Sequence, residues 1–162
     1  MCLSRFLHAM TLQSARRRAF WVISRVGLRL YRRFPVFGTL RASLAVIEQN
    51  GRVLAIRRND GRGFSFPGGL AMPWESELET LEREVAEETG LCVTACERTL
   101  QYHSAADIPC KISVFRVNAI GELRDSWEGQ PEWVTLTELR SGIIASQSAI
   151  VQKMESSATC PL

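Results

Sequence analysis

The segment Gly69–Leu91, GLAMPWESELETLEREVAEETGL, carries more information than any other part of this 162-residue chain. Its glutamates Glu84, Glu87 and Glu88 stand at i, i+3 and i+4, which places them on one face of an α-helix. Like charges at this spacing repel one another, whereas a hard divalent cation such as Mg²⁺ attracts carboxylate oxygens and usually keeps waters and phosphates as further ligands. The segment therefore predicts a metal-binding helix and metal-assisted chemistry on a phosphate compound.

The same helix carries an apolar stripe beside its acidic face. Leu78, Leu81 and Val85 recur at helical spacing, so we expect them to dock the helix on a hydrophobic core. Thr89-Gly90 is expected to end the helix, because glycine is the usual residue just past a helix C-terminus.

The segment resembles the signature of the Nudix hydrolase family, which reads G, five residues, E, seven residues, then R-E-U-x-E-E-x-G-U, where U is aliphatic. The match covers every fixed position: Gly69, Glu75, Arg83, Glu84, Val85, Glu87, Glu88, Gly90 and Leu91. One local departure is Trp74, which stands where the family often has glycine before the first glutamate. The signature does not require that glycine.

The resemblance implies a Nudix α/β/α sandwich with a mixed β-sheet. It also implies a pyrophosphohydrolase that uses Mg²⁺ or Mn²⁺ to cleave the pyrophosphate bond of a nucleoside diphosphate linked to another moiety. The alternative is a catalytically silent Nudix-fold module that senses a nucleotide or regulates a partner. Such modules commonly lose glutamates of the signature, and this chain keeps all of them, which favours turnover.

The resemblance assigns roles to individual residues. Glu84, Glu87 and Glu88 correspond to the metal ligands, the carbonyl of Gly69 to a further ligand, and Arg83 to the residue that holds a glutamate in place. Glu75 would support the junction between loop and helix. The general base is left open between two candidates in the signature, Glu84 and Glu88, and two in a later loop, Glu128 and Glu132.

Residues outside the signature are candidates for substrate contacts. We expect Trp74 to be the best placed aromatic residue for stacking on a base, because it lies in the glycine-rich loop. The other aromatic candidates are Phe64, Phe66, Tyr102 and Trp127, and the candidates for phosphate contacts are Arg57, Arg58 and Arg62. No marker of a particular substrate class stands out.

Two parts of the chain differ sharply in charge. Residues 1–47 contain nine arginines and no acidic residue, whereas the remainder has 11 basic and 17 acidic residues. We expect residues 1–37 to form a basic, helical N-terminal extension and residues 38–158 to form the Nudix domain. The extension is amphipathic over residues 3–33, which is typical of a targeting peptide, of a membrane-surface anchor, or of a helix that packs on the domain or on a second subunit.

The expected partners are therefore a small nucleotide substrate, an anionic membrane surface or partner protein that binds the extension, and a second copy in a homodimer.

Five cysteines without a CxxC pair indicate a reducing compartment, and we expect a cytoplasmic location. The extension leaves peripheral membrane association and organelle targeting as alternatives. Cys92 and Cys96 have the spacing of residues on one strand face, where they would serve as small core residues.

Hydrophobic patterning predicts the remaining elements. Asn50-Gly51 is a strong hairpin signal between two apolar segments. The expected strands are Leu40–Gln49, Arg52–Arg58, Val93–Tyr102, Lys111–Ala119 and Glu132–Val134, followed by a short helix at Leu136–Leu139, capped by Thr135 or Thr137, and a final helix over residues 146–156.

Overall fold

The computed structural model describes residues 39–106 and 109–158. The strands are β1 (Leu40–Val46), β2 (Glu48–Gln49), β3 (Arg52–Arg58), β4 (Phe64–Ser65), β5 (Gly68–Leu70), β6 (Cys92–Ser104), β7 (Cys110–Ile120) and β8 (Gly129–Val134). The helices are α2 (Glu77–Thr89), α3 (Leu136–Gly142), a 3₁₀ turn η1 (Ala145–Gln147) and α4 (Ser148–Ala158). The predicted N-terminal extension lies outside the described residues. In the described part, no helix has the length and apolar content that crossing a bilayer needs.

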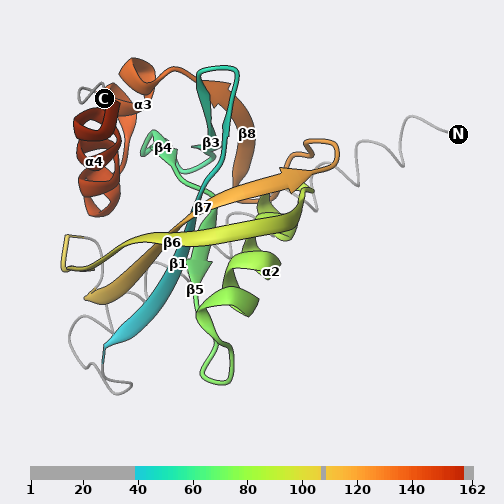
Figure 1. Cartoon of the computed structure of the whole chain (residues 1–162), viewed down its shortest axis with the longest axis vertical. Coiled ribbons are helices and arrows are strands. Elements are labelled where there is room, and N and C mark those ends of the chain that lie inside the picture. The colour runs from blue at the N-terminus through green and yellow to red at the C-terminus, as the bar shows by residue number, and fades with distance from the viewer. Residues whose placement is uncertain (1–38, 107–108, 159–162) are drawn as a thin grey trace, which may run out of the picture. The chain divides into compact units, whose positions relative to one another are not determined.

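The strands form two sheets. The first is mixed, in the order β5-β1-β7-β6, with β1 and β7 parallel and the other pairs antiparallel. In the second sheet β3 pairs antiparallel with β2, β4 and β8. Helix α2 lies on one side of this arrangement, and α3 and α4 lie on the other (Figure 1). The predicted α/β layering with a mixed sheet is confirmed, with the addition of a separate antiparallel sheet.

The predicted hairpin is present, but its first strand is shorter than expected. The segment Leu40–Gln49 divides at Ile47 into β1, which belongs to the first sheet, and β2, which belongs to the second. The turn between β2 and β3 is made by Asn50 and Gly51, with φ of 51° and 71°, the left-handed conformation that a two-residue hairpin turn requires.

Two groups of apolar side chains form the core. One fills the space between the sheets and the C-terminal helices, and the other seals α2 against the first sheet through Leu81 and Val85, which are both 0% exposed. Leu78 was expected in this stripe, but it is 43% exposed because it lies in the first turn of α2, at the rim of the contact.

The prediction that Cys92 and Cys96 share a strand face is wrong, and of the two only Cys96 packs against the core group that contains Leu81 and Val85. Cys92 is exposed and Cys96 only half-buried. A β-bulge between Val93 and Ala95 shifts the pairing of β6 with β7, so the two cysteines lie on opposite faces of the strand. Side chains alternate between the two faces of a regular strand, so a bulge that adds one residue reverses the face predicted for every residue beyond it.

Candidate active site

Helix α2 begins at a capping box. Ser76 Oγ accepts a hydrogen bond from the Glu79 N–H (3.2 Å), and the Glu79 carboxylate accepts one from the Ser76 N–H (2.8 Å). The helix ends at Gly90, in the left-handed conformation, as predicted. Both ends are therefore fixed, and the acidic face of α2 is held rigidly beside the loop that contains β5.

Arg83 connects this helix to the loop. Its guanidinium donates from Nε to Glu75 Oε1 (2.7 Å), from Nη2 to Glu75 Oε2 (2.9 Å) and from Nη1 to Glu84 Oε1 (2.8 Å). A weaker bond runs to the Leu70 carbonyl (3.3 Å), and Glu87 Oε2 lies 3.5 Å from Nη1. Arg83 thus orients Glu84 and ties the helix to the loop.

Glu75 fastens the other end of this network. Its Oε2 also accepts hydrogen bonds from the Met72 N–H (3.0 Å) and the Thr80 hydroxyl (3.1 Å). The hydrogen bonds from Arg83, followed by that from the Met72 N–H, lower the pKa of Glu75 to about 2 from 4.5. The carboxylate therefore stays ionised and keeps its partners well into acidic solution.

Replacing Glu75 with Gln is expected to make the stability of the protein less dependent on pH in acidic solution. Because the folded pKa is the lower one, ionised Glu75 stabilises the fold fully above pH 4.5 and loses this effect as the pH falls towards 2. Melting temperatures measured between pH 2 and 7 should converge for Glu75→Gln and wild type at the acid end, separate as the pH rises from 2 to 4.5, and differ by a constant margin above pH 4.5. Glu82→Gln, which removes an exposed glutamate from the same helix, is the control. Curves for Glu75→Gln and wild type that stay parallel between pH 2 and 4.5 would contradict this assignment.

Glu88 is buried at the centre of the site. It is 4% exposed, and its Oε2 accepts a hydrogen bond from the Gly68 N–H (2.8 Å). Burial, reinforced by the charges of Glu128 and Glu84, raises the pKa of Glu88 well above its ordinary value. The carboxylates of Glu84, Glu88 and Glu128 thus converge beside the glycine-rich loop.

Glu84 lies directly against Gly69. A methyl group at Gly69 would come within 2.5 Å of Glu84 Oε1, so a side chain at this position would require the carboxylate to move. Burial also raises the pKa of Glu84, while its ion pair with Arg83 opposes that shift. Glu87 differs from both, because its side chain is 60% exposed at the outer edge of the acidic face.

The structure separates the two loop carboxylates that the sequence left equivalent. Glu128 is half-buried, and its carboxylate interacts with those of Glu88 and Glu84. Glu132 lies opposite Ala55 on the face of the second sheet that turns away from α2, and it forms an ion pair with Arg57. Its Oε1 is buried and has no hydrogen bond of good geometry. Only Glu128 joins the acidic cluster.

The predicted substrate residues are scattered. Arg58 lies near enough to the acidic cluster for its charge to interact with those of Glu128 and Glu88. Phe66 is 0% exposed within the core, where no ligand can stack on it, and Trp74 is 79% exposed. Phe64 is buried under the Arg57 guanidinium, and the Tyr102 hydroxyl donates a hydrogen bond to the Ser146 carbonyl. Trp127 is 50% exposed, and Arg62 forms an ion pair with Asp60.

The donor set fits a hard cation in part. Carboxylate oxygens of Glu84, Glu88 and Glu128 are the ligand type that Mg²⁺ and Mn²⁺ prefer, and burial raises the pKa values of Glu84 and Glu88. Within residues 39–106 and 109–158, no three acidic, histidine or cysteine side chains are already arranged as a closed metal cage. This is compatible with Mg²⁺, which is commonly held by one or two carboxylates together with waters and substrate phosphates.

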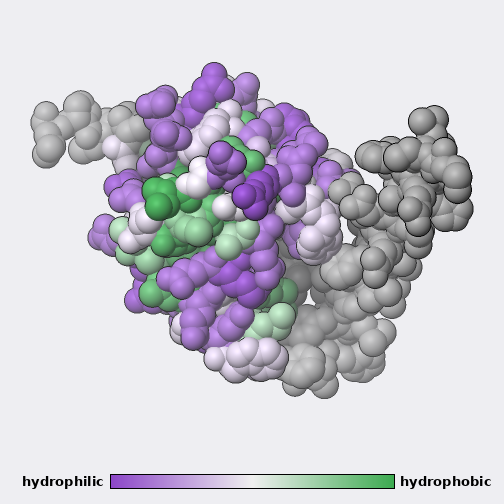
Figure 2. Space-filling view, turned by 90° about the vertical axis from the view of Figure 1, so that its right-hand side faces the viewer, coloured by the Kyte–Doolittle hydropathy of each residue, from purple (hydrophilic) through white to green (hydrophobic). Residues whose placement is uncertain are grey.

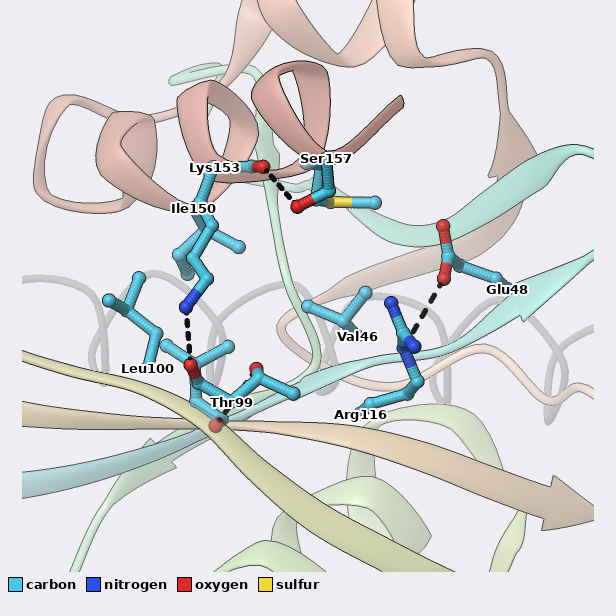
Figure 3. Close-up of a pocket in the computed structure, with 10 residues that line it drawn as sticks. Val46, Glu48, Thr99, Leu100, Arg116, Ile150, Lys153 and Ser157 are labelled. Carbon is cyan, nitrogen blue, oxygen red and sulfur yellow. Dashed lines mark hydrogen bonds and ion pairs between the residues drawn. The ribbon is translucent and has the colours of Figure 1, made fainter. Parts of the chain in front are cut away.

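Two surface depressions lie away from the carboxylates. One, of about 250 Å³, lies between α4 and the β6–β7 pair, with Lys153 donating to the Thr99 carbonyl (2.6 Å) at its edge (Figure 3). The other, of about 420 Å³, includes Ile120 at the end of β7 and Leu123 just beyond it. One face of the domain carries an apolar area bordered by polar residues (Figure 2). None of the predicted site residues lines either depression.

This chain has a mixed sheet, a glycine-rich loop around β5 and the acidic helix α2. These features place it among α/β proteins whose site lies between a loop and a helix. The NUDIX domain family matches residues 39–153, so the chain belongs to the Nudix family. It is 37% identical over 68 residues to a MutT-like protein of Streptomyces ambofaciens, a match that covers 42% of this chain and 44% of that relative.

Solved structures agree with this assignment. The E. coli ORF135 protein has a TM-score of 0.65 and 21% identity, with 75% of this chain and 91% of that one covered. The MutT protein from Bacillus halodurans has a TM-score of 0.60 and 25% identity, with 70% and 80% covered. These similarities establish the Nudix fold of the described domain.

Proposed function

We propose that the chain is a divalent-cation-dependent pyrophosphohydrolase, which cleaves the pyrophosphate bond of a nucleoside diphosphate linked to another moiety. One observation carries the proposal: the buried carboxylate of Glu88 meets those of Glu84 and Glu128 beside Gly68 and Gly69. Burying carboxylates together is unfavourable unless a cation offsets the repulsion. Such a cluster is therefore better explained by a metal site than by structural need.

Each residue has a separate role in this mechanism. Glu88 and Glu84 would hold Mg²⁺ or Mn²⁺, with Glu87 and the Gly69 carbonyl as outer or additional ligands. The bound ion would neutralise charge on the phosphate oxygens and lower the pKa of a water molecule. Arg83 keeps Glu84 in place, and Arg58 would contact the phosphate chain of the substrate.

Glu128 is the general base that the geometry favours. It lies beside Glu88, and its loop is fixed because the Glu128 carbonyl accepts a hydrogen bond from the Asn59 N–H (2.9 Å). A base in this position could accept a proton from a water molecule bound at the cluster.

Exchanging each loop glutamate for Gln tests this choice. Glu128→Gln is expected to lower kcat by roughly 10²-fold, the usual contribution of a positioned base. Glu132→Gln is the matched control, four residues further on in β8, and should stay within about twofold of wild type, because Glu132 lies on the face of the second sheet that turns away from α2. Equal losses in both variants, or a loss confined to Glu132→Gln, would exclude Glu128 as the base.

A substrate screen tests the proposed function itself. The purified chain would be incubated with nucleoside triphosphates, oxidised dGTP, ADP-ribose, NADH, dinucleoside polyphosphates and nucleotide sugars, with Mg²⁺, Mn²⁺ or EDTA. We expect turnover of one class, which EDTA abolishes. If nucleotides shift the melting temperature but none is hydrolysed under any condition, the sensing module would be the better account.

A further inference from the structure

Asp60 is the centre of a compact ion-pair cluster in the loop between β3 and β4. Its carboxylate is 13% exposed. Arg58 donates to it from Nε (3.1 Å to Oδ1) and Nη2 (2.8 Å to Oδ2), and Arg62 donates from Nε (2.8 Å) and from its backbone N–H (3.1 Å). This pairing is bidentate for Arg58, the geometry that fixes a guanidinium most firmly.

The same loop touches the acidic cluster from one side. Leu54, Ile56 and Arg58 alternate along β3 and share the face that packs towards α2. The charge of Arg58 interacts with those of Glu128 and Glu88. Asn59, between Arg58 and Asp60, donates from its backbone N–H to the Glu128 carbonyl (2.9 Å) and from Nδ2 to the Trp127 carbonyl (3.1 Å). The loop thus holds a cation and a carboxylate in fixed relation beside the buried Glu88.

We propose that Asp60 is a positioning residue, which holds the Arg58 guanidinium in the orientation that binds the diphosphate group of the substrate. This rests on the proposed function, because Arg58 would meet a diphosphate only if one is bound at the acidic cluster. Asp60 itself is engaged by two arginines and does not contact the substrate. Its contribution lies in pre-organising Arg58, whose long side chain would otherwise sample several rotamers.

Asp60 could affect diphosphate binding through its negative charge or through its contact with Arg58, and the two accounts predict opposite effects of Asp60→Asn. Asp60→Asn removes one negative charge near the site, so long-range attraction alone would make an anionic diphosphate bind more tightly. If Asp60 acts by holding Arg58, the same substitution must weaken binding despite the added net positive charge. The sign of the change therefore separates the two accounts.

The probe is methylenediphosphonate, a hydrolysis-resistant diphosphate without a base, titrated calorimetrically into the full chain with Mg²⁺ present. Asp60→Asn is expected to raise the dissociation constant about tenfold, the effect of losing hydrogen bonds between charged groups. Asp60→Glu, which keeps the charge and moves the carboxylate by one methylene, should fall between Asp60→Asn and wild type. Glu155→Gln makes the same charge change at the ion pair of Arg140 with Glu155, between α3 and α4, and should match wild type.

A double-mutant cycle tests whether Asp60 acts through Arg58. Arg58→Ala should weaken binding at least as much as Asp60→Asn, and adding Asp60→Asn to Arg58→Ala should cause no further loss. Additive losses would overturn the proposal, as would unchanged or tighter binding in Asp60→Asn. If Asp60→Asn lowers the melting temperature too far for titration, the decision passes to Asp60→Glu, whose binding must be weaker than that of wild type.

These outcomes are separate from those of the substrate screen. A chain that hydrolyses a substrate while Asp60→Asn binds the diphosphonate normally would refute the role of Asp60 and leave the proposed function intact. A chain that binds the diphosphonate, loses this binding in Asp60→Asn and hydrolyses nothing would refute hydrolysis alone. A wild-type chain that does not bind the diphosphonate would refute the role given to Arg58 and Asp60.

Discussion

Glu88→Gln is expected to lower kcat/KM by about 10²–10³-fold while making the metal-free protein more resistant to heat. The loss of activity follows because an amide cannot supply the charge that holds a divalent cation at a site where transition-state charge must be offset. The gain in stability follows because Glu88 is 4% exposed beside Glu84 and Glu128, so its ionised form is unfavourable without a cation.

The pH dependence of this gain has a defined sign. The folded pKa of Glu88 is raised above the ordinary 4.5, so the folded chain binds this proton more tightly than the unfolded chain does. The stability of the metal-free protein should therefore fall as the pH rises above 4.5 and through the folded pKa, and Glu88→Gln should remove this part of the decline. Thermal unfolding with EDTA between pH 4 and 9 measures it, with Glu82→Gln as the exposed control. Lower stability of Glu88→Gln at neutral pH would show that the carboxylate has a structural role.

Arg83→Ala is expected to lower kcat/KM by about a hundredfold. Its guanidinium joins Glu75 to Glu84 through bonds of 2.7–2.9 Å, and its removal frees Glu84 to leave the position beside Gly69. Displacement of an active-site group by about 1 Å can cost this much. Arg83→Lys should restore little of the loss, because an ammonium cannot bridge two carboxylates with the planar fork of arginine.

The control for Arg83→Ala is Arg140→Ala, which removes an exposed arginine from the Arg140–Glu155 pair on α3 and α4. Activity of each variant would be measured against metal concentration, since a displaced Glu84 should raise the amount of cation needed for half-maximal rate. If Arg83→Ala retained the wild-type rate and metal dependence, Arg83 would be no more than a stabiliser of the helix.

The loop–helix unit could be predicted from sequence because its interactions are local. Glu75, Arg83 and Glu84 lie within ten residues, so the spacing that identifies them also brings them into contact. Helix α2 was equally predictable, since its capping box and terminal glycine are local signals.

Features that depend on pairing between distant strands could not be predicted in this way. Glu128 and Glu132 are four residues apart and looked equivalent, but the register of β8 against β3 turns Glu132 away from α2. Phe66 looked accessible in a glycine-rich loop, yet it fills the core between the sheets. The role of Asp60 depends on the fold of a surface loop, which neither periodicity nor composition reveals.

The central claim is that Glu84 and Glu88 bind a divalent cation beside Gly69. The most direct test is a crystal structure of the protein grown with Mn²⁺, with anomalous scattering used to locate the ion. We expect an anomalous peak within about 2.0–2.5 Å of carboxylate oxygens of Glu88 and Glu84, and no such peak in Glu88→Gln. A fully occupied Mn²⁺ elsewhere, or an anomalous map without a peak at this cluster when Mn²⁺ is saturating, would contradict the account.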